Sequence, residues 1–235
     1  MSGGETRAMA ERAGGAGAQG AAAARAAVVI PAGGEGRRMG GRRKPFLVLA
    51  GEPLLCHTLR PFLEHPLVHW VIVALPAADA AHPPAWLADA DGRIRVVAGG
   101  AERGDSVRNA LEAVPAAADV VLVHDAARPL VSREVIDRAI RTAAAGQACV
   151  AAIPVSDTIK EVEAGGVVVG TPDRARLWQA QTPQAFPRAL IVHAYARAAR
   201  EGVRATDDAA LVELYGAGVV IVEGAPENIK VTTPA

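Results

Sequence analysis

The chain has 235 residues, of which 51% are hydrophobic, and it carries 25 basic and 25 acidic residues. This length and apolar content suffice for one large α/β domain with a buried core. A net charge of zero argues against a general binder of nucleic acids or membrane surfaces. The aromatic content of 3% also argues against single-stranded nucleic-acid binding by base stacking.

The N-terminal segment 1–26 is rich in alanine and glycine and has no apolar core typical of a signal peptide, so we expect a disordered extension. No apolar run is long enough to span a bilayer, which predicts a cytoplasmic protein with no membrane partner. The two cysteines, Cys56 and Cys149, are far apart and are expected to be reduced thiols. Residues 27–235 are predicted to form a single domain.

Short apolar runs alternate with amphipathic patterns along this domain. The predicted buried strands are 26–32, 70–76, 93–100, 119–125 and 148–155. The predicted helices are 53–64, 104–114, 132–145, 187–200 and 207–216. This alternation indicates an α/β fold, a Rossmann-like three-layer sandwich whose mostly parallel sheet is covered on both faces. Ligands of such sheets bind beyond the carboxyl ends of the strands, so Gly33, Gly99-Gly100, Asp125 and Arg128 are candidate functional positions.

Residues 156–174 interrupt the alternation. They predict two short strands around Gly165-Gly166, a β-hairpin rather than a βαβ unit. Because an isolated hairpin is marginally stable in water, we expect it to pack on something else, and a second subunit is one candidate.

The segment 28–46, VVIPAGGEGRRMGGRRKPF, joins an apolar run to glycines and cationic side chains. A dinucleotide-binding fingerprint, GxGxxG, does not fit, because Met39 stands where the third glycine is required. A P-loop, GxxxxGK[ST], does not fit either, because Arg42-Arg43 follow Gly41 and provide no hydroxyl for magnesium.

A third interpretation of this loop is a cradle that wraps a nucleoside triphosphate with backbone N–H groups. Arg38 and Lys44 would then neutralise the charge that develops on phosphorus in the transition state. The residues alone leave open a strand–turn–helix with a solvated basic face.

Further motifs follow the loop in order. They are GGAERGDSV (99–107), VHDAARP (123–129), SDTIK (156–160), LWQAQTPQAF (177–186), TDDA (206–209) and ENIKVT (227–232). With PAGGEGRRM and KPFLVLAGEPLL, their order and spacing resemble the 2-C-methyl-D-erythritol 4-phosphate cytidylyltransferase family of the non-mevalonate isoprenoid pathway, over about residues 26–234.

The resemblance implies a nucleotidyltransferase-type fold and the family's reaction. A phosphate oxygen of methylerythritol phosphate attacks the α-phosphorus of CTP in line, with Mg²⁺, giving 4-diphosphocytidyl-2-C-methyl-D-erythritol and pyrophosphate. It also implies a homodimer in which the arm at 156–174 completes the substrate site of the neighbouring subunit.

The resemblance further implies four sets of site residues. The catalytic set is Arg38, Lys44, Arg174 and Lys230. The nucleotide-binding set is Pro31, Ala32, Gly33, Gly34, Glu35, Gly36, Gly99, Gly100 and Ser106, the last three at the cytosine. The substrate-binding set is Arg128, Thr158, Thr182 and Thr206, and the metal ligand is Asp125.

Structural alternatives stand beside some of these assignments. Ser106 could cap the helix that follows it, and Asp125 with Arg128 could form an i,i+3 ion pair. Asp207, which is not in these sets, is left open between a direct role and a cap of the helix at 207–216.

Rival functions also stay open. A cytidylyltransferase acting on ribitol 5-phosphate shares most of the scaffold, and HDAARP favours the methylerythritol enzyme over it. A hexose-phosphate nucleotidyltransferase is disfavoured by the 156–174 arm and QTPQ. A catalytically idle nucleotide-binding module is disfavoured because Arg38, Lys44 and Asp125 are all present.

Overall fold

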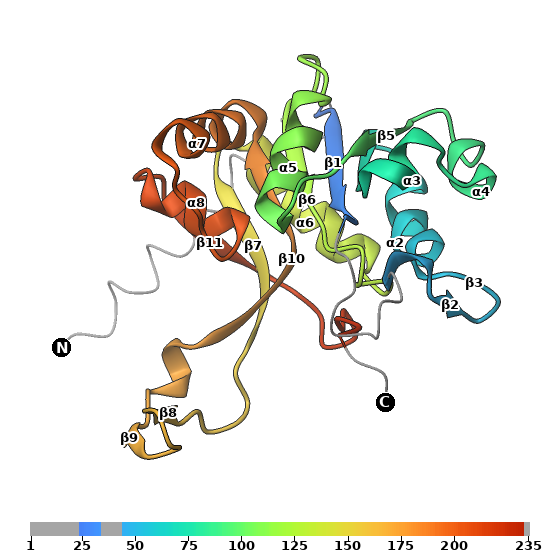
Figure 1. Ribbon diagram of the computed structural model, residues 1–235. Coiled ribbons are helices and arrows are strands. Elements are labelled where there is room, and N and C mark those ends of the chain that lie inside the picture. The colour runs from blue at the N-terminus through green and yellow to red at the C-terminus, as the bar shows by residue number, and fades with distance from the viewer. Residues whose placement is uncertain (1–23, 34–43, 233–235) are drawn as a thin grey trace.

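The computed structural model describes residues 24–33 and 44–232, apart from the Lys44 side chain (Figure 1). Residues 1–23 of the predicted extension lie outside the described residues. The last three residues of that extension are already part of the fold. Ala26 begins the first strand, and the Arg25 backbone N–H donates to Asp119 Oδ2 at 2.8 Å.

A seven-stranded sheet forms the centre of the molecule, in the order β11-β7-β10-β6-β1-β4-β5. The strands are β1 (Ala26–Pro31), β4 (Val68–Leu75), β5 (Ile94–Ala98), β6 (Val120–Val123), β7 (Ala148–Pro154), β10 (Trp178–Pro187) and β11 (Val219–Glu223). The predicted mostly parallel sheet is confirmed, and β10 is antiparallel to both of its neighbours, β6 and β7. All five predicted strands are present, whereas β10 and β11 were not predicted.

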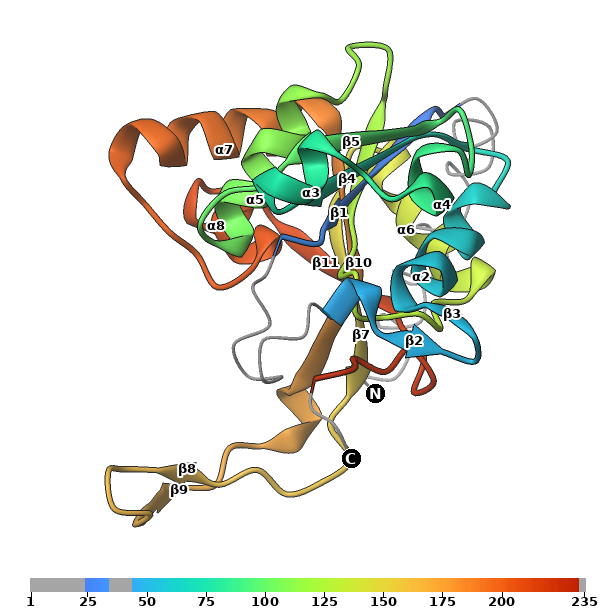
Figure 2. The same ribbon diagram turned by 45° about the vertical axis from the view of Figure 1, so that its right-hand side comes forward.

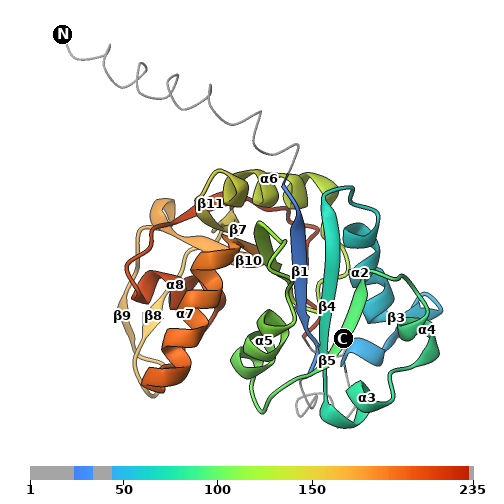
Figure 3. The same cartoon turned by 90° about the horizontal axis from the view of Figure 1, so that it is seen from above.

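The five predicted helices are also present, and helices cover both faces of the sheet (Figure 3). They are α2 (Leu54–Leu63), α5 (Arg103–Glu112), α6 (Arg133–Ala144), α7 (Arg188–Glu201) and α8 (Asp208–Leu214). Two short helices, α3 (Ala77–Ala81) and α4 (Ala85–Ala88), and two single turns, η4 (Lys44–Phe46) and η5 (Arg174–Arg176), complete the set described. The Ser132 hydroxyl caps α6 by accepting from Val135 N–H at 3.4 Å.

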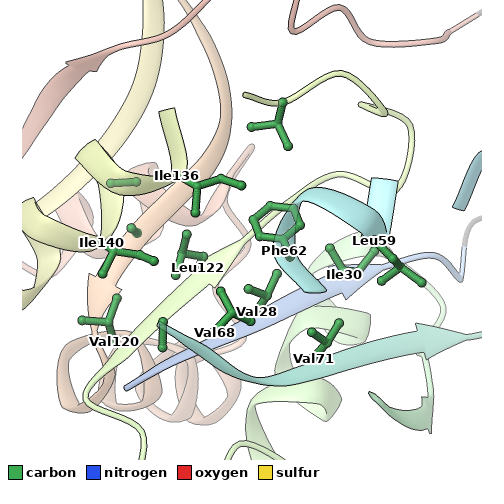
Figure 4. Packing of buried hydrophobic residues seen from close by; sticks show 14 of the residues in the cluster. Val28, Ile30, Leu59, Phe62, Val68, Val71, Val120, Leu122, Ile136 and Ile140 are labelled. Carbon is green, nitrogen blue, oxygen red and sulfur yellow. The ribbon is translucent and has the colours of Figure 1, made fainter. Parts of the chain in front are cut away.

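Two apolar clusters, one on each face, hold the layers together. Because successive strand residues point to opposite faces, Val28 and Ile30 join one cluster and Val29 joins the other. The first cluster packs β1 and β4 against α2 and α6, with Phe62 fully buried at its centre (Figure 4). The second packs the opposite face against α5, α7 and α8. The sheet is therefore fixed from both sides, which holds its carboxyl-end loops in place.

The predicted hairpin is confirmed as β8 (Glu161–Val162) paired antiparallel with β9 (Val168–Gly170). Gly165 and Gly166 turn the chain between them with φ of 91° and 82°, values that L side chains rarely adopt. The hairpin and the segments that join it to β7 and β10 extend away from the rest of the sheet (Figures 1 and 2).

Two further features concern partners and redox state. In the described part of the chain, no helix is long and apolar enough to cross a membrane. Cys56 and Cys149 are free thiols, as expected from their spacing.

A small hairpin of β2 (Val48–Leu49) and β3 (Glu52–Pro53) precedes α2.

Candidate active site

The carboxyl ends of the parallel strands β1, β4, β5 and β6 meet at one edge of the sheet. The residues that directly follow β1, β5 and β6 are still hydrogen-bonded through their backbone to the neighbouring strands. Ala32 N–H donates to Ala74 O at 2.8 Å, and Gly99 N–H donates to Leu75 O at 2.6 Å. His124 N–H donates to Val29 O at 2.9 Å, which sets Asp125 beside the end of β1. The predicted Pro31–Gly33, Gly99-Gly100 and Asp125 positions therefore share this edge.

Glycine backbone and one buried hydroxyl form the first half of the site. A Cβ added at Gly99 would lie 2.8 Å from Ser106 Oγ, and one at Gly33 would lie 3.1 Å from the same atom. At Gly100 an added Cβ would lie 2.2 Å from the Asp105 Cβ. A side chain at Gly99 or Gly100 would force neighbouring atoms to shift, and one at Gly33 would make a tight contact, so bare backbone is what remains at these positions to face a ligand.

The Ser106 hydroxyl holds this glycine segment. It accepts from Gly100 N–H at 3.1 Å and donates to Glu102 O at 3.1 Å, and the residue is 2% exposed. The alternative that Ser106 caps the helix is wrong, because Glu102 is the N-cap residue of α5. With its hydrogen donated and one lone pair used, the hydroxyl keeps one acceptor position.

A carboxylate among cations forms the second half of the site. Lys230 Nζ lies 2.8 Å and Arg128 Nε 3.7 Å from Asp125 Oδ2, and Arg103 Nε lies 3.3 Å from Oδ1. Burial alone raises the pKa of Asp125, but Arg103 and Lys230 together lower that pKa to about 2. The carboxylate is therefore ionised at neutral pH. The alternative that Asp125 and Arg128 form an ion pair is confirmed. This pairing does not prevent either side chain from binding a ligand.

The segment that carries Lys230 is pinned against β10 and the turn after β6. The Asn228 side-chain amide donates to Thr182 O at 2.8 Å, and Val231 N–H donates to Ala127 O at 2.8 Å. An Arg128 N–H donates to Asn228 O at 2.6 Å. The ENIKVT motif thus lies along the HDAARP turn, which explains how residues about 100 positions apart, such as Asn228 and Arg128, belong to one site.

Arg103 contacts the predicted site residue Asp125, and the sequence did not lead us to expect it there. Its guanidinium binds both carboxylate oxygens of Asp208, at 3.2 and 2.6 Å, while its Nε faces Asp125. Asp208 is fully buried and also accepts from Tyr195 OH at 2.5 Å. Burial opposes the charge on Arg103, and Asp208 more than offsets that effect and raises the arginine pKa. The available signal was the arginine in ERGDSV together with the second aspartate of TDDA.

Some predicted residues lie apart from this cluster. Thr158 and Arg174 are exposed on the arm, where an Arg174 N–H donates to Ser156 O at 2.6 Å. Thr206 is exposed and lines a cavity of about 270 Å³ together with Arg103 and Asp207. The capping role of Asp207 is confirmed, because its Oδ1 accepts from Ala210 N–H at 2.8 Å.

Other predicted residues are not covered by the structure. Gly34, Glu35, Gly36 and Arg38 lie outside the described residues, as does the Lys44 side chain. The Lys44 backbone begins η4, next to the buried Pro45.

The donor set around Asp125 suits one kind of metal. Among residues 24–33 and 44–232 there is no group of three or more histidine, cysteine or carboxylate side chains that could hold an ion by themselves. Mg²⁺ commonly takes one or two protein carboxylates and completes its shell with phosphate oxygens and water. The single ionised carboxylate of Asp125, at the same edge as the glycine segment, fits that mode.

The fold and this edge together define a class of protein. A mostly parallel α/β sheet, with a glycine segment and the ionised Asp125 at its carboxyl edge, fits the nucleotidyltransferase type, and solved structures of that type are similar to this chain. The crystal structure of 4-diphosphocytidyl-2C-methyl-D-erythritol synthase from Anaerococcus prevotii is similar, with a TM-score of 0.79 and 30% identity over 89% of this chain and 91% of that one. The crystal structure of 2-C-methyl-D-erythritol 4-phosphate cytidylyltransferase from Thermus thermophilus gives a TM-score of 0.76 and 38% identity over 89% and 94%.

Sequence comparison agrees with the structural one. The family model for 2-C-methyl-D-erythritol 4-phosphate cytidylyltransferase matches residues 26–235. The protein of that name from Symbiobacterium thermophilum is 49% identical over 208 residues, which cover 88% of this chain and 87% of the relative. The chain belongs to the 2-C-methyl-D-erythritol 4-phosphate cytidylyltransferase family.

Proposed function

We propose that this protein transfers CMP from CTP to 2-C-methyl-D-erythritol 4-phosphate, giving 4-diphosphocytidyl-2-C-methyl-D-erythritol and pyrophosphate. A phosphate oxygen of the sugar alcohol forms a bond to the α-phosphorus of CTP, and the bond from that phosphorus to pyrophosphate breaks. The observation that carries the proposal is the ionised Asp125, with Lys230, Arg103 and Arg128 around it, at the same sheet edge as the glycine segment. Both reactants are polyanions, so alignment and charge neutralisation are the main tasks of the site.

The nucleotide is assigned to the glycine half of the site. Pro31, Ala32 and Gly33 lead into the loop that contains Gly34, Glu35 and Gly36, and we assign this loop to the triphosphate. Gly99, Gly100 and Ser106 are assigned to the cytosine. The free acceptor position of the buried Ser106 hydroxyl suits the exocyclic amine of cytosine, which uracil lacks.

Asp125 is assigned to Mg²⁺, which would supply charge neutralisation at the phosphates. Arg38 and Lys44 are assigned to the transition state, where their charge would be needed most. Arg128 and Lys230 are assigned to the sugar phosphate, because a guanidinium and an ammonium of the same cluster can both bind a phosphate. Thr206, exposed beside Arg103, joins the substrate set, whereas the burial of the Thr182 hydroxyl favours an indirect role for that residue.

The arm is assigned to a second subunit. Val162, Val167, Val168 and Val169 are 50–61% exposed on it, which is unfavourable for a hairpin surrounded by water. A homodimer would cover these valines and bring Thr158 and Arg174 to the partner's substrate site. The two unpaired cysteines suit the reducing cytoplasm as the place of reaction.

The test is pyrophosphate release with Mg²⁺, crossing CTP, UTP, ATP and GTP against methylerythritol phosphate and ribitol 5-phosphate. Release with CTP and methylerythritol phosphate alone is expected. Release with ribitol 5-phosphate in its place would transfer the protein to the rival cytidylyltransferase activity. A folded protein that is silent with every pair would overturn the proposal in favour of an idle nucleotide-binding module.

A further inference from the structure

The four-residue turn after β6, from Asp125 to Arg128, is fixed through its backbone by three distant parts of the chain and by His124, the residue directly before it. Asp125 N–H donates to Thr182 Oγ1 at 3.0 Å, and Ala126 O accepts from Thr58 Oγ1 at 2.9 Å. Ala127 O accepts from Val231 N–H at 2.8 Å, and Arg128 O lies 3.0 Å from His124 Nε2. Each residue of the turn is therefore held by its own hydrogen bond. Two of the partners, His124 and Thr182, are also hydrogen-bonded to each other.

The partners determine the direction of each hydrogen bond in this pair. Arg128 O can only accept, so His124 Nε2 carries a hydrogen and donates to it. In a neutral ring the other nitrogen, Nδ1, is then an acceptor, and it takes the Thr182 hydroxyl hydrogen across 3.1 Å. The same hydroxyl oxygen accepts from Asp125 N–H. A continuous chain runs from the amide of Asp125 through Thr182 and His124 to the carbonyl of Arg128.

Burial makes this chain rigid. His124 is fully buried and Thr182 is 5% exposed, and the Phe62 ring packs edge-on against the imidazole at 4.9 Å between centroids. The Thr182 hydroxyl donates its single hydrogen to His124, so it has no hydrogen to offer a phosphate.

We propose that His124 and Thr182 are positioning residues, which hold the Asp125 carboxylate and the Arg128 guanidinium in the orientation that the reaction needs. The inference rests on the proposed function, and it gives Thr182 a role through the backbone in place of direct contact with the sugar phosphate. Some residues do not touch the metal but hydrogen-bond to its ligand and orient it. Replacing such a residue commonly lowers metal affinity or activity by about 10–100-fold.

The first test is spectroscopic and uses the wild-type protein without substrate or metal. In a ¹⁵N-labelled sample, long-range ¹H–¹⁵N correlations distinguish the two tautomers and the imidazolium, and His124→Gln identifies the signal among the six histidines. The Nε2–H tautomer is expected at pH 6–8, with the Nδ1 signal shifting in Thr182→Val because that nitrogen loses its donor. An Nδ1–H tautomer or an imidazolium in the wild type would overturn the inference.

The second test compares Thr182→Val with Thr182→Ser, which keeps the hydroxyl. Thr182→Val is expected to lower kcat by about 10–100-fold and to raise the Mg²⁺ concentration needed for half-activation, with KM for methylerythritol phosphate little changed. Thr182→Ser is expected to recover most of that loss. Cys149→Ala, in the strand next to β10, controls for lost core stability and should keep wild-type kinetics.

The outcomes separate the inference from the function on which it rests. A Thr182→Val enzyme that keeps kcat and its Mg²⁺ dependence, but has a raised KM for methylerythritol phosphate, would make Thr182 a substrate contact and overturn the inference. If Thr182→Val does not fold, the kinetics of Thr182→Ser and the tautomer of His124 in the wild type still test whether Thr182 acts as a positioning residue. Absence of wild-type turnover would overturn the proposed function and this inference with it.

Discussion

The turn at Asp125–Arg128 and the arm at 156–174 carry predicted site residues in opposite environments. Every residue of the turn is at most 9% exposed, and each has a backbone group that is hydrogen-bonded within the chain. On the arm, Thr158 and Arg174 are exposed, and four valines are at least half exposed. Under the proposed function, one half of the site would be built by a single chain, and the other half would need a second chain.

The same physical rule explains both environments. A buried carboxylate and guanidinium are stable only where charges and hydrogen bonds compensate them, so the turn has to be complete before any ligand arrives. Exposed valines on a two-stranded hairpin bury little area by themselves, so the proposed partner would add stability to the arm. The turn is accordingly expected to be sensitive to single polar substitutions, and the arm to changes that affect association.

The largest effect is expected from Asp125→Asn, which removes the negative charge that Arg103, Arg128 and Lys230 surround. A metal ion at phosphates supplies several kcal/mol of transition-state stabilisation, so loss of its carboxylate is expected to lower kcat by about 10³-fold. Steady-state kinetics over a range of Mg²⁺ concentrations measure the effect, with the exposed Asp89→Asn as control. Activity within about threefold of wild type at saturating Mg²⁺ would remove Asp125 from the metal site.

The second effect concerns the ion pair between Arg103 and the buried Asp208, which holds the arginine that faces Asp125. Asp208→Asn removes the fully buried partner of Arg103 and is expected to lower the free energy of unfolding by about 2–4 kcal/mol. Tyr195→Phe removes only one hydrogen bond to the same carboxylate and should lower it by about 1 kcal/mol. Urea denaturation measures both. Equal stabilities for Asp208→Asn and wild type would show that the pair does not contribute to the fold.

The sequence predicted most of the fold because strand–helix alternation is a local signal. It failed at β10, whose residues WQAQTPQAFP contain two prolines and no β-branched residue except Thr182. Tertiary contacts override that weak strand preference, since Gln184, Ala185 and Phe186 are buried between β6 and β7. At β11 the run VVIV was present in the sequence and was overlooked.

The site was predicted in part, for a related reason. Residues at strand ends, such as Gly99 and Asp125, were found because parallel topology brings strand ends together. Arg103 was missed because its role depends on Asp208, 105 positions away, and no local pattern encodes that pairing. The burial of Thr182 and its hydrogen bonds could not be predicted for the same reason, because its partners His124 and Asp125 are 58 and 57 positions away in the sequence.

The third prediction tests the arm. Val168→Asp places a charge among the exposed valines and is expected to shift the protein from dimer to monomer in sedimentation velocity. Because the partner's Arg174 would then be lost from the site, kcat/KM for methylerythritol phosphate should fall by about tenfold, the size of one lost charged contact. Val168→Thr keeps the shape and serves as control. A monomeric wild type would contradict the assignment of the arm to a second subunit.

The smallest effect is expected from Gly166→Ala, which tests whether the arm is independent of the turn. At φ of 82° an alanine costs about 1–2 kcal/mol, so the hairpin should open more often. Amide hydrogen exchange should then speed up about fivefold or more at Glu163, whose N–H donates to Val167 O at 2.9 Å. Exchange at Val28 and Val29 in β1 should not change, because the hairpin lies outside both apolar clusters. Gly92→Ala, a glycine with open space around it and no positive φ, is the matched control. Faster exchange in β1 as well would mean that opening of the arm spreads into the sheet, where β1 pairs with the strand that leads into the turn, and that arm and turn belong to one cooperative unit.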